Sequence, residues 1–291
     1  MFTGSHFSTD ADTTTSTSFE IFEGTSALTM ATANRFAGSA HAAVAKRGVF
    51  SVALSGGTTP KNLYALMAAN ADLHARIPWP KIHFFFGDER HVAPDQPESN
   101  FRMVSEAMFQ HLESAPHVHR ICGELVDTKE AASRYQSDLQ NFFDTPNRTE
   151  DGFPKFDLVF LGLGTDGHTA SLFPNSPALQ ENHLWVVANW VAKLEAFRIT
   201  LTVPAINSAR EAIILVAGAP KAQIVSEVLK RAAIPPRYPV QRIMLSNGIK
   251  RWMLDSDAAS ILLKTDPRLL AAKAEQHCDQ TRQPVAFCAR L

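Results

Sequence analysis

Residues 156–174 read FDLVFLGLGTDGHTASLFP, and this stretch decides the class of fold. Its first part, residues 156–162, is apolar on almost every position and has the length of one strand. Strands that are apolar on consecutive residues are typical of a parallel sheet covered on both faces. The glycine-rich turn that follows brings an acid and a histidine directly to the end of this run. The stretch therefore predicts a buried parallel strand with candidate functional residues at its carboxyl end.

Other short apolar runs, separated by helix-like segments, extend this pattern along the chain. The runs cover residues 50–55, 82–87, 184–190, 198–203, 211–218 and, more weakly, 251–255. The helix-like segments cover residues 26–46, 60–70, 101–113, 129–143, 205–209 and 220–232. Strands interleaved with helices predict a layered α/β/α fold with a mostly parallel, Rossmann-like sheet. Ligands of such sheets bind beyond the carboxyl ends of the strands, so we expect the functional site at these ends.

The composition predicts one globular catalytic domain with extensions at both ends. Hydrophobic residues make up 45% and charged residues 20% of the 291 residues, which suits a sizeable core. Residues 19–265 are expected to form a single α/β domain, because no linker is long enough to force a cut. Residues 1–18 are polar and contain no Lys or Arg, so we expect a disordered leader. Residues 266–291 form an extension whose role is open.

The charge balance and the cysteines restrict the cellular setting and the partners. The 28 basic and 29 acidic residues give a net charge of -1, which offers no global field for nucleic acid or a membrane surface. The 3 cysteines are too few and too scattered for a disulfide framework. No apolar run approaches the roughly 20 residues that cross a bilayer. We therefore expect a cytoplasmic monomer or weak dimer that acts on a small molecule.

The first candidate strand end is a glycine pair after residues 50–55. Gly56 and Gly57 allow backbone N–H groups to approach a ligand, and Thr58 adds a hydroxyl just before a helix expected to open at Lys61. A helix start of this kind favours an anion such as phosphate. The pattern matches neither a nucleotide P-loop nor a dinucleotide fingerprint. An ordinary tight turn is the alternative.

The second candidate strand end follows residues 82–87. Asp88, Glu89 and Arg90 come directly after this run, and a polar loop then leads to Asn100. Arg90 is suited to grip a phosphate or carboxylate with two hydrogen bonds. The alternative is that the three charged side chains form a solvated ion-pair cluster.

The third candidate strand end is the turn of the opening stretch. His168 can accept a proton at physiological pH, and Asp166 can hold its tautomer. Gly162, Gly164 and Gly167 are expected to leave the histidine accessible. The alternative is a helix-capping aspartate beside an incidental histidine.

The fourth candidate strand end follows residues 184–190. Lys193 and Arg198 lie on both sides of the approach to the next run and would attract an anion, although solvated surface lysines are common. All four candidate ends follow runs that we assign to one sheet, and the topology of such a sheet brings them to a common rim.

Together these motifs resemble the 6-phosphogluconolactonase family, which shares its fold with glucosamine-6-phosphate deaminases. The resemblance rests on SGGTTP (55–60), FFFGDERHVAPDQPESN (84–100), LGLGTDGHTASLFP (161–174), K-x4-RITLTVPAINSA (193–209) and WMLDSDAA (252–259). The family usually has serine at the position of Thr58 and tryptophan at that of Phe86. Deaminases resemble DGHIAFNEP at the histidine, and this chain lacks the Asn-Glu-Pro. The lactonase branch is therefore the better match, with a deaminase or a non-catalytic sugar-phosphate sensor as the alternatives.

The resemblance implies hydrolysis of 6-phospho-D-glucono-1,5-lactone, the second step of the oxidative pentose phosphate pathway. For this reaction we expect His168 to act as general base towards water and then as acid towards the leaving oxygen, with Asp166 positioning either His168 or the substrate. The substrate and its phosphate are expected to contact Gly56, Gly57, Thr58, Asp88, Arg90, Asn100, Lys193 and Arg198. No cofactor and no metal are expected. Asp88, Glu89, His91 and His168 are the set that would ligate a cation if one were needed.

Overall fold

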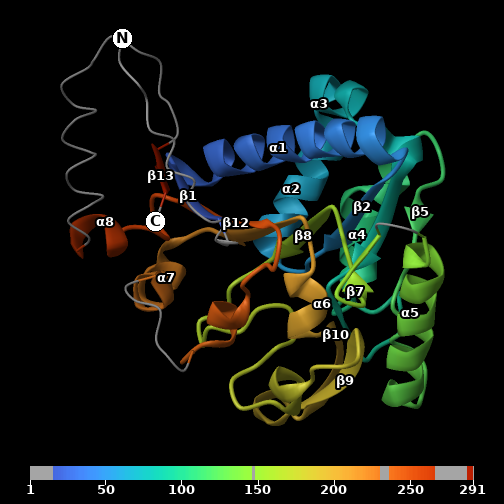
Figure 1. The fold of residues 1–291 in the computed structure, drawn as a ribbon. Helices are drawn as coiled ribbons and strands as arrows, with labels where there is room; N and C mark the ends of the chain where they lie inside the picture. Colours follow the sequence, from blue (N-terminus) through green and yellow to red (C-terminus); the bar gives the residue numbers. More distant parts are fainter. Residues whose placement is uncertain (1–15, 146–147, 230–235, 266–286, 291) are drawn as a thin grey trace, which may run out of the picture.

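The structure, a computed structural model, describes residues 16–145, 148–229, 236–265 and 287–290. Its main sheet has eight strands in the order β13-β1-β12-β11-β8-β2-β3-β5 (Figure 1). They are β1 (Ser16–Phe22), β2 (Phe50–Leu54), β3 (Ile82–Phe86), β5 (His117–Val118), β8 (Leu158–Leu161), β11 (Glu211–Val216), β12 (Ile249–Asp255) and β13 (Phe287–Arg290). Every pairing except that of β13 with β1 is parallel. The predicted α/β fold is confirmed.

Helices connect the strands and cover the sheet. The α-helices are α1 (Gly24–Arg47), α2 (Thr58–Ala69), α3 (Ala71–Arg76), α4 (Asn100–Ala107), α5 (Thr128–Phe143), α6 (Val203–Asn207), α7 (Ala222–Leu229) and α8 (Leu262–Thr265). Short 3-10 helices are η1 (Trp79–Lys81), η2 (Phe109–His111), η3 (Pro177–Gln180), η4 (Ala192–Leu194), η5 (Ala219–Lys221) and η6 (Pro239–Arg242). Helix α1 runs along the sheet and packs against α2, β2 and β12 (Figure 1).

The apolar runs form the centre of the main sheet. Every residue of β2 and of β8 is buried. Phe36 of α1 stacks on Phe160 of β8 at a centroid distance of 6.2 Å, and Tyr64 of α2 meets the same ring edge-on at 6.4 Å. Burial on both faces explains why these strands are apolar on consecutive positions.

A second, antiparallel sheet contains strands that we had assigned to the main sheet. Its order is β4 (Asp88–Arg90), β10 (Ala196–Leu201) and β9 (Val186–Val191). A separate hairpin pairs β6 (Thr149–Glu150) with β7 (Phe153–Pro154). The prediction that residues 184–190 and 198–203 belong to the main sheet was wrong. The short connection between β9 and β10 suits antiparallel strands, whereas a parallel crossover needs a dozen residues or more.

Gly87 joins the two sheets. Its N–H donates to the carbonyl of Leu54 in β2 at 2.8 Å, and its own carbonyl accepts from the N–H of Leu201 in β10 at 2.9 Å. The chain therefore passes from the parallel sheet into the antiparallel one within a single residue. This transition places the second sheet beside the carboxyl ends of the parallel strands.

The terminal segments include strands of the main sheet. Strand β1 begins at Ser16, inside the segment that we expected to be a leader, and pairs with β12. Strand β13 belongs to the extension 266–291 and pairs with β1. The remaining parts of both predictions, residues 1–15, 266–286 and 291, lie outside the described residues.

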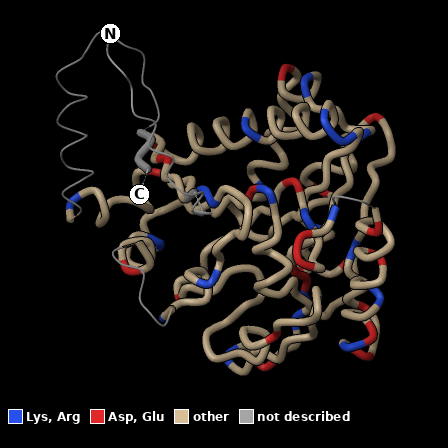
Figure 2. Tube along the Cα trace, viewed as in Figure 1, with Lys and Arg blue, Asp and Glu red and all other residues tan. Residues whose placement is uncertain are grey.

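None of the helices in the described ranges has the length and apolarity that a membrane span requires. Figure 2 shows basic and acidic residues distributed over many parts of the described trace.

Three histidines gather at the β3–β5 edge of the main sheet. The ring of His83 stacks on His117 at 4.7 Å, and its Nδ1 lies 3.1 Å from Nε2 of His119. Burial, followed by the charges of His117, His119 and Arg148, lowers the pKa of His83 to about 4. Asp138 is the carboxylate whose charge acts on this cluster, where it opposes the lowering of the His119 pKa by burial. Folding therefore favours neutral His83.

We predict a loss of stability on acidification that depends on His83. A lowered pKa in the folded state means that the unfolded chain binds more protons between pH 6.5 and about 4. The contribution of His83 to the unfolding free energy is thus fully present above pH 6.5 and lost as the pH falls towards 4. Urea unfolding at a series of pH values should show a shallower decline for His83→Phe than for the wild type. Parallel curves for the two proteins would contradict this assignment.

Candidate active site

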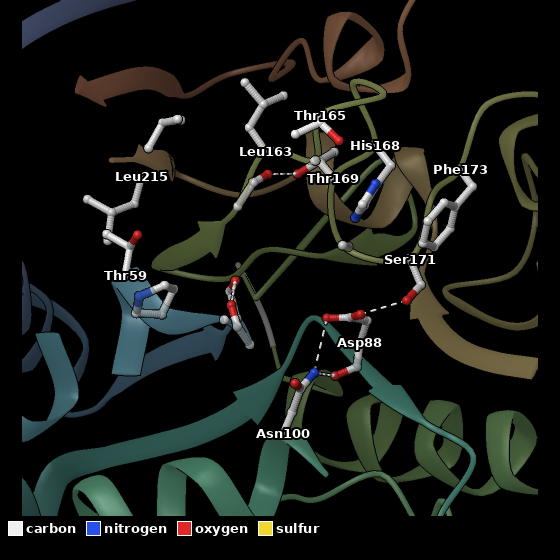
Figure 3. A pocket seen from close by; sticks show the side chains of 18 of the residues that line it. Thr59, Asp88, Asn100, Leu163, Thr165, His168, Thr169, Ser171, Phe173 and Leu215 are labelled. Carbon is white, nitrogen blue, oxygen red and sulfur yellow. Dashed lines mark hydrogen bonds between the residues drawn. The ribbon is translucent and has the colours of Figure 1, made fainter. Parts of the chain in front are cut away.

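A cavity of about 530 Å³ opens beyond the carboxyl ends of β2, β3, β8 and β11. Its lining includes every residue that the sequence predicted for the site, namely Gly56, Gly57, Thr58, Asp88, Arg90, Asn100, Asp166, His168, Lys193 and Arg198. Figure 3 shows Thr59 and Leu215 on one side of this cavity and His168 and Phe173 on the other. The chain thus brings the four candidate strand ends to one place, although two of them reach it from the second sheet.

The glycine pair forms the start of α2. Gly57, with φ 103°, precedes the helix, which begins at Thr58 and not at Lys61 as we expected. The N–H of Lys61 already bonds to the carbonyl of Gly57 at 3.0 Å, so the first turn closes earlier. A Cβ at Gly56 would overlap the side-chain amide of Asn100. The pair therefore brings the N-terminus of α2 to the cavity, where its free N–H groups favour an anion.

Glu89 is buried and binds backbone amides, so the alternative of a solvated ion-pair cluster is wrong for this residue. Its carboxylate accepts hydrogen bonds from the N–H groups of Arg90 and Asn100 at 2.7 Å and of Phe101 at 2.8 Å. The hydroxyl of Ser99 adds a fourth bond at 3.0 Å. Burial raises the pKa of Glu89, and these amide bonds oppose the rise. The arrangement fixes β4 to the start of α4.

Asp88 and Asn100 lie at the base of the cavity in a hydrogen-bonded chain. The amide nitrogen of Asn100 donates to the carbonyl of Asp88 at 2.9 Å (Figure 3). The hydroxyl of Ser171 donates to the Asp88 carboxylate at 2.6 Å. This chain ties β4 to the segment that follows His168. Ser171 therefore acts as a hydrogen-bond donor to Asp88 in this structure.

Arg90 and Arg198 are direct neighbours across β4 and β10. Within the described ranges neither guanidinium forms an ion pair; Arg90 bonds to the carbonyl of Glu98 and Arg198 to that of Phe197. Burial, and next the charge of Arg90, lower the pKa of Arg198. Two adjacent guanidiniums repel one another, and an anionic ligand would relieve that repulsion.

His168, Asp166 and Lys193 form a connected set on the opposite wall. Nδ1 of His168 lies 2.5 Å from one carboxylate oxygen of Asp166, and Nζ of Lys193 lies 3.1 Å from the other. Burial raises the pKa of Asp166, but the bonds from His168 and Lys193 outweigh it and lower the pKa to about 2. Asp166 is therefore ionised at neutral pH and orients the imidazole. Phe173 stacks on His168 at 4.1 Å and fixes the ring plane.

The glycines of the turn have different roles. A Cβ at Gly164 would overlap the imidazole of His168, so only glycine fits there. Gly167 adopts φ 78°, a left-handed conformation that favours glycine. A Cβ at Gly162, by contrast, would meet only Oγ of Ser55 at 3.8 Å. The expectation that Gly162 is needed to keep the histidine accessible was therefore wrong.

The sequence analysis did not identify three residues that shape the cavity. Lys221 of η5 lines it and donates to the carbonyl of Leu163 at 2.6 Å, and burial lowers its pKa against the charge of Asp166. Phe173 and Ser171 contact His168 and Asp88 as described above. Lys221 follows the predicted run 211–218 by a few residues, so the strand-end rule applied there would have found it.

The four residues named above as possible cation ligands, Asp88, Glu89, His91 and His168, already form hydrogen bonds within the protein. The carboxylate of Glu89 binds backbone amides, and Nε2 of His91 lies 2.8 Å from the carbonyl of Leu125. No His, Cys, Asp or Glu side chains of the described part of the chain are grouped so as to hold a metal ion. Metal independence remains a prediction.

Comparison with known proteins adds a family to this geometry. Residues 23–252 match the family model described as glucosamine-6-phosphate isomerases/6-phosphogluconolactonase. A 6-phosphogluconolactonase of Synechocystis sp. is 42% identical over 76% of this chain and 88% of its own. One of Mycobacterium tuberculosis is 36% identical over 85% of this chain and 99% of its own. The crystal structure of a 6-phosphogluconolactonase from Shewanella baltica superposes with a TM-score of 0.71 and 27% identity, covering 83% of this chain and 97% of that one.

The two turn glycines provide a matched pair of variants. Gly164→Ala should destabilise the fold by about 1–3 kcal/mol, the usual cost of overpacking, because its methyl group meets His168. Gly162→Ala places the same methyl group at an ordinary van der Waals distance from its neighbour. The free energy of unfolding of this variant should lie within about 0.5 kcal/mol of that of the wild type. Urea unfolding of the three proteins measures both effects. Equal stability of the two variants would show that the His168 ring is not held against Gly164.

Proposed function

This chain belongs to the glucosamine-6-phosphate isomerase/6-phosphogluconolactonase family, and we propose that it hydrolyses 6-phospho-D-glucono-1,5-lactone with His168 as general base. It is an enzyme of the 6-phosphogluconolactonase type. The observation that carries the mechanism is the Asp166–His168 pair on a cavity that also contains adjacent arginines. The product is 6-phospho-D-gluconate, formed in the second step of the oxidative pentose phosphate pathway.

The proposed chemistry follows from the orientation of the imidazole. Nδ1 of His168 donates to Asp166, which leaves Nε2 free to accept a proton. Water attacks the lactone carbonyl carbon while Nε2 takes its proton, and a negative charge develops on the carbonyl oxygen. The bond from this carbon to the ring oxygen then breaks, and the protonated His168 returns the proton to that oxygen. Ionised Asp166 stabilises the imidazolium for as long as His168 holds the proton.

The two sides of the cavity suit the two ends of the substrate. The phosphate binds at the start of α2, on the amides of Gly56, Gly57 and Thr58, with the guanidinium of Arg90. Arg198 supplies a second guanidinium beside Arg90.

Lys193 differs from these cations because it is bonded to Asp166. This contact supports placing Lys193 near the reacting carbonyl, where its positive charge stabilises the oxyanion. The reaction needs no metal and no organic cofactor, because a lactone is already an activated ester. We also propose the cytoplasm as its location.

The role of His168 can be tested with freshly prepared 6-phosphogluconolactone in an assay coupled to a dehydrogenase. His168→Ala should lower kcat by a factor on the order of 10²–10⁴, the usual contribution of a general base, with an unchanged unfolding midpoint. The wild type should release no ammonia from glucosamine 6-phosphate, which separates hydrolysis from deamination. A variant within a few-fold of wild-type kcat would remove His168 from the chemistry, and binding of the lactone without turnover would indicate a sensor.

A further inference from the structure

A tyrosine on a distant segment fills the space behind the Asp166–Gly167–His168 turn. Gly167 has no side chain, and a Cβ placed on it would lie 2.5–2.8 Å from the Cβ, Cγ and Cδ1 atoms of Tyr238. The aromatic ring therefore packs directly on the backbone of the turn, on the position between the two candidate catalytic side chains. The N–H of Val240 also donates to the carbonyl of Gly167 at 3.1 Å.

The segment that contains Tyr238 is itself attached to α7. The Tyr238 hydroxyl donates to the carboxylate of Glu227, and the side-chain oxygen of Gln241 accepts from the N–H of Tyr238 at 3.0 Å. The side-chain nitrogen of Gln241 donates to the carbonyl of Val228 at 3.2 Å. Arg237 lies over the ring of Tyr238 at 5.1 Å, which adds a cation–π contact. These bonds attach the segment to α7 both through the tyrosine hydroxyl and, independently of it, through Gln241.

The chain around α7 holds the catalytic turn at two points. Just before the helix, Lys221 donates to the carbonyl of Leu163, on the strand side of the turn. Beyond the helix, Tyr238 and Val240 hold Gly167. Inside the turn, backbone bonds run from the N–H of Gly167 to the carbonyl of Gly164 at 3.0 Å and from the N–H of Gly164 to the carbonyl of His168 at 2.8 Å, beside the side-chain bond between Asp166 and His168.

We propose that Tyr238 is a positioning residue, whose ring holds Gly167 so that Asp166 and His168 face the cavity in reactive geometry. This inference rests on the proposed hydrolysis. Tyr238 does not line the cavity, so it acts through the turn and makes no contact with the substrate. Losing the ring removes this packing and leaves the Val240 hydrogen bond to hold Gly167. Displacement of a catalytic group by about 1 Å costs up to 10²-fold in rate.

The ring, and not the hydroxyl, carries the proposed role, and kinetics on 6-phosphogluconolactone can separate the two. Tyr238→Ala should lower kcat by about 10- to 10²-fold with KM within about twofold of wild type, because substrate contacts remain. Tyr238→Phe keeps the ring and should restore kcat to within about threefold. Met244→Ala, at an exposed side chain further along the same segment, is the matched control and should behave like wild type. A wild-type kcat in Tyr238→Ala, or a Phe variant as impaired as the Ala variant, would overturn the proposal.

A second measurement does not depend on the reaction. Gly167→Ala is strained by its backbone conformation in any background, but its methyl group meets the ring only when Tyr238 is present. Its shift of the urea midpoint should therefore be smaller in the Tyr238→Ala background than in wild type. Equal shifts would show that the ring does not support Gly167. If the wild type failed to hydrolyse the lactone, the proposed function would fall, whereas this double-mutant cycle would still decide the contact.

Discussion

The position of the site depends on one buried carboxylate, that of Glu89. Burying a charge without a cation is costly unless hydrogen bonds satisfy it, and here three amides and the Ser99 hydroxyl do so. This requirement fixes β4 to α4 immediately after Gly87 has carried the chain from one sheet to the other. Because side chains alternate along a strand, Glu89 points to α4 while Asp88 and Arg90 point to the cavity. By fixing the strand, buried Glu89 thus holds the charged side chains of Asp88 and Arg90 at the cavity.

At His168, too, the residues that hold the side chain in place differ from the residue proposed to react. Asp166 is ionised and orients His168, and Phe173 stacks on the ring. The imidazole therefore has little rotational freedom. Gly162, Gly164 and Gly167 of the turn beneath it contribute no side-chain packing. Further support comes from outside the turn, from Lys221 on one side and Tyr238 on the other. The flexible sequence needed for a close approach is thereby made rigid by its neighbours.

Much of the fold and the site could be predicted from the sequence. Apolar runs bounded by turn residues located β2, β3, β8 and β11, and the rule for strand ends brought His168 and Arg90 to one cavity. The apolar runs alone did not reveal that β9 and β10 form another sheet, because an apolar run does not specify its partner; the short connection between the two runs was the available signal. The role of Glu89 as a buried anchor could not be predicted either, since its amide partners depend on how the loop to α4 folds back. Tyr238 lies far along the chain, and only the contact with Gly167 shows its relevance.

In the proposed function, a cationic cavity holds a phosphorylated lactone against a histidine base. The most direct test is kcat/KM for 6-phosphogluconolactone compared with that for D-glucono-1,5-lactone, which has the same ester but no phosphate. Charge-assisted hydrogen bonds contribute about 1.5–3 kcal/mol each, so the phosphorylated substrate should be preferred by a factor on the order of 10² or more. Equal values for the two lactones would contradict the account, because the arginines and the start of α2 would then have no ligand to bind.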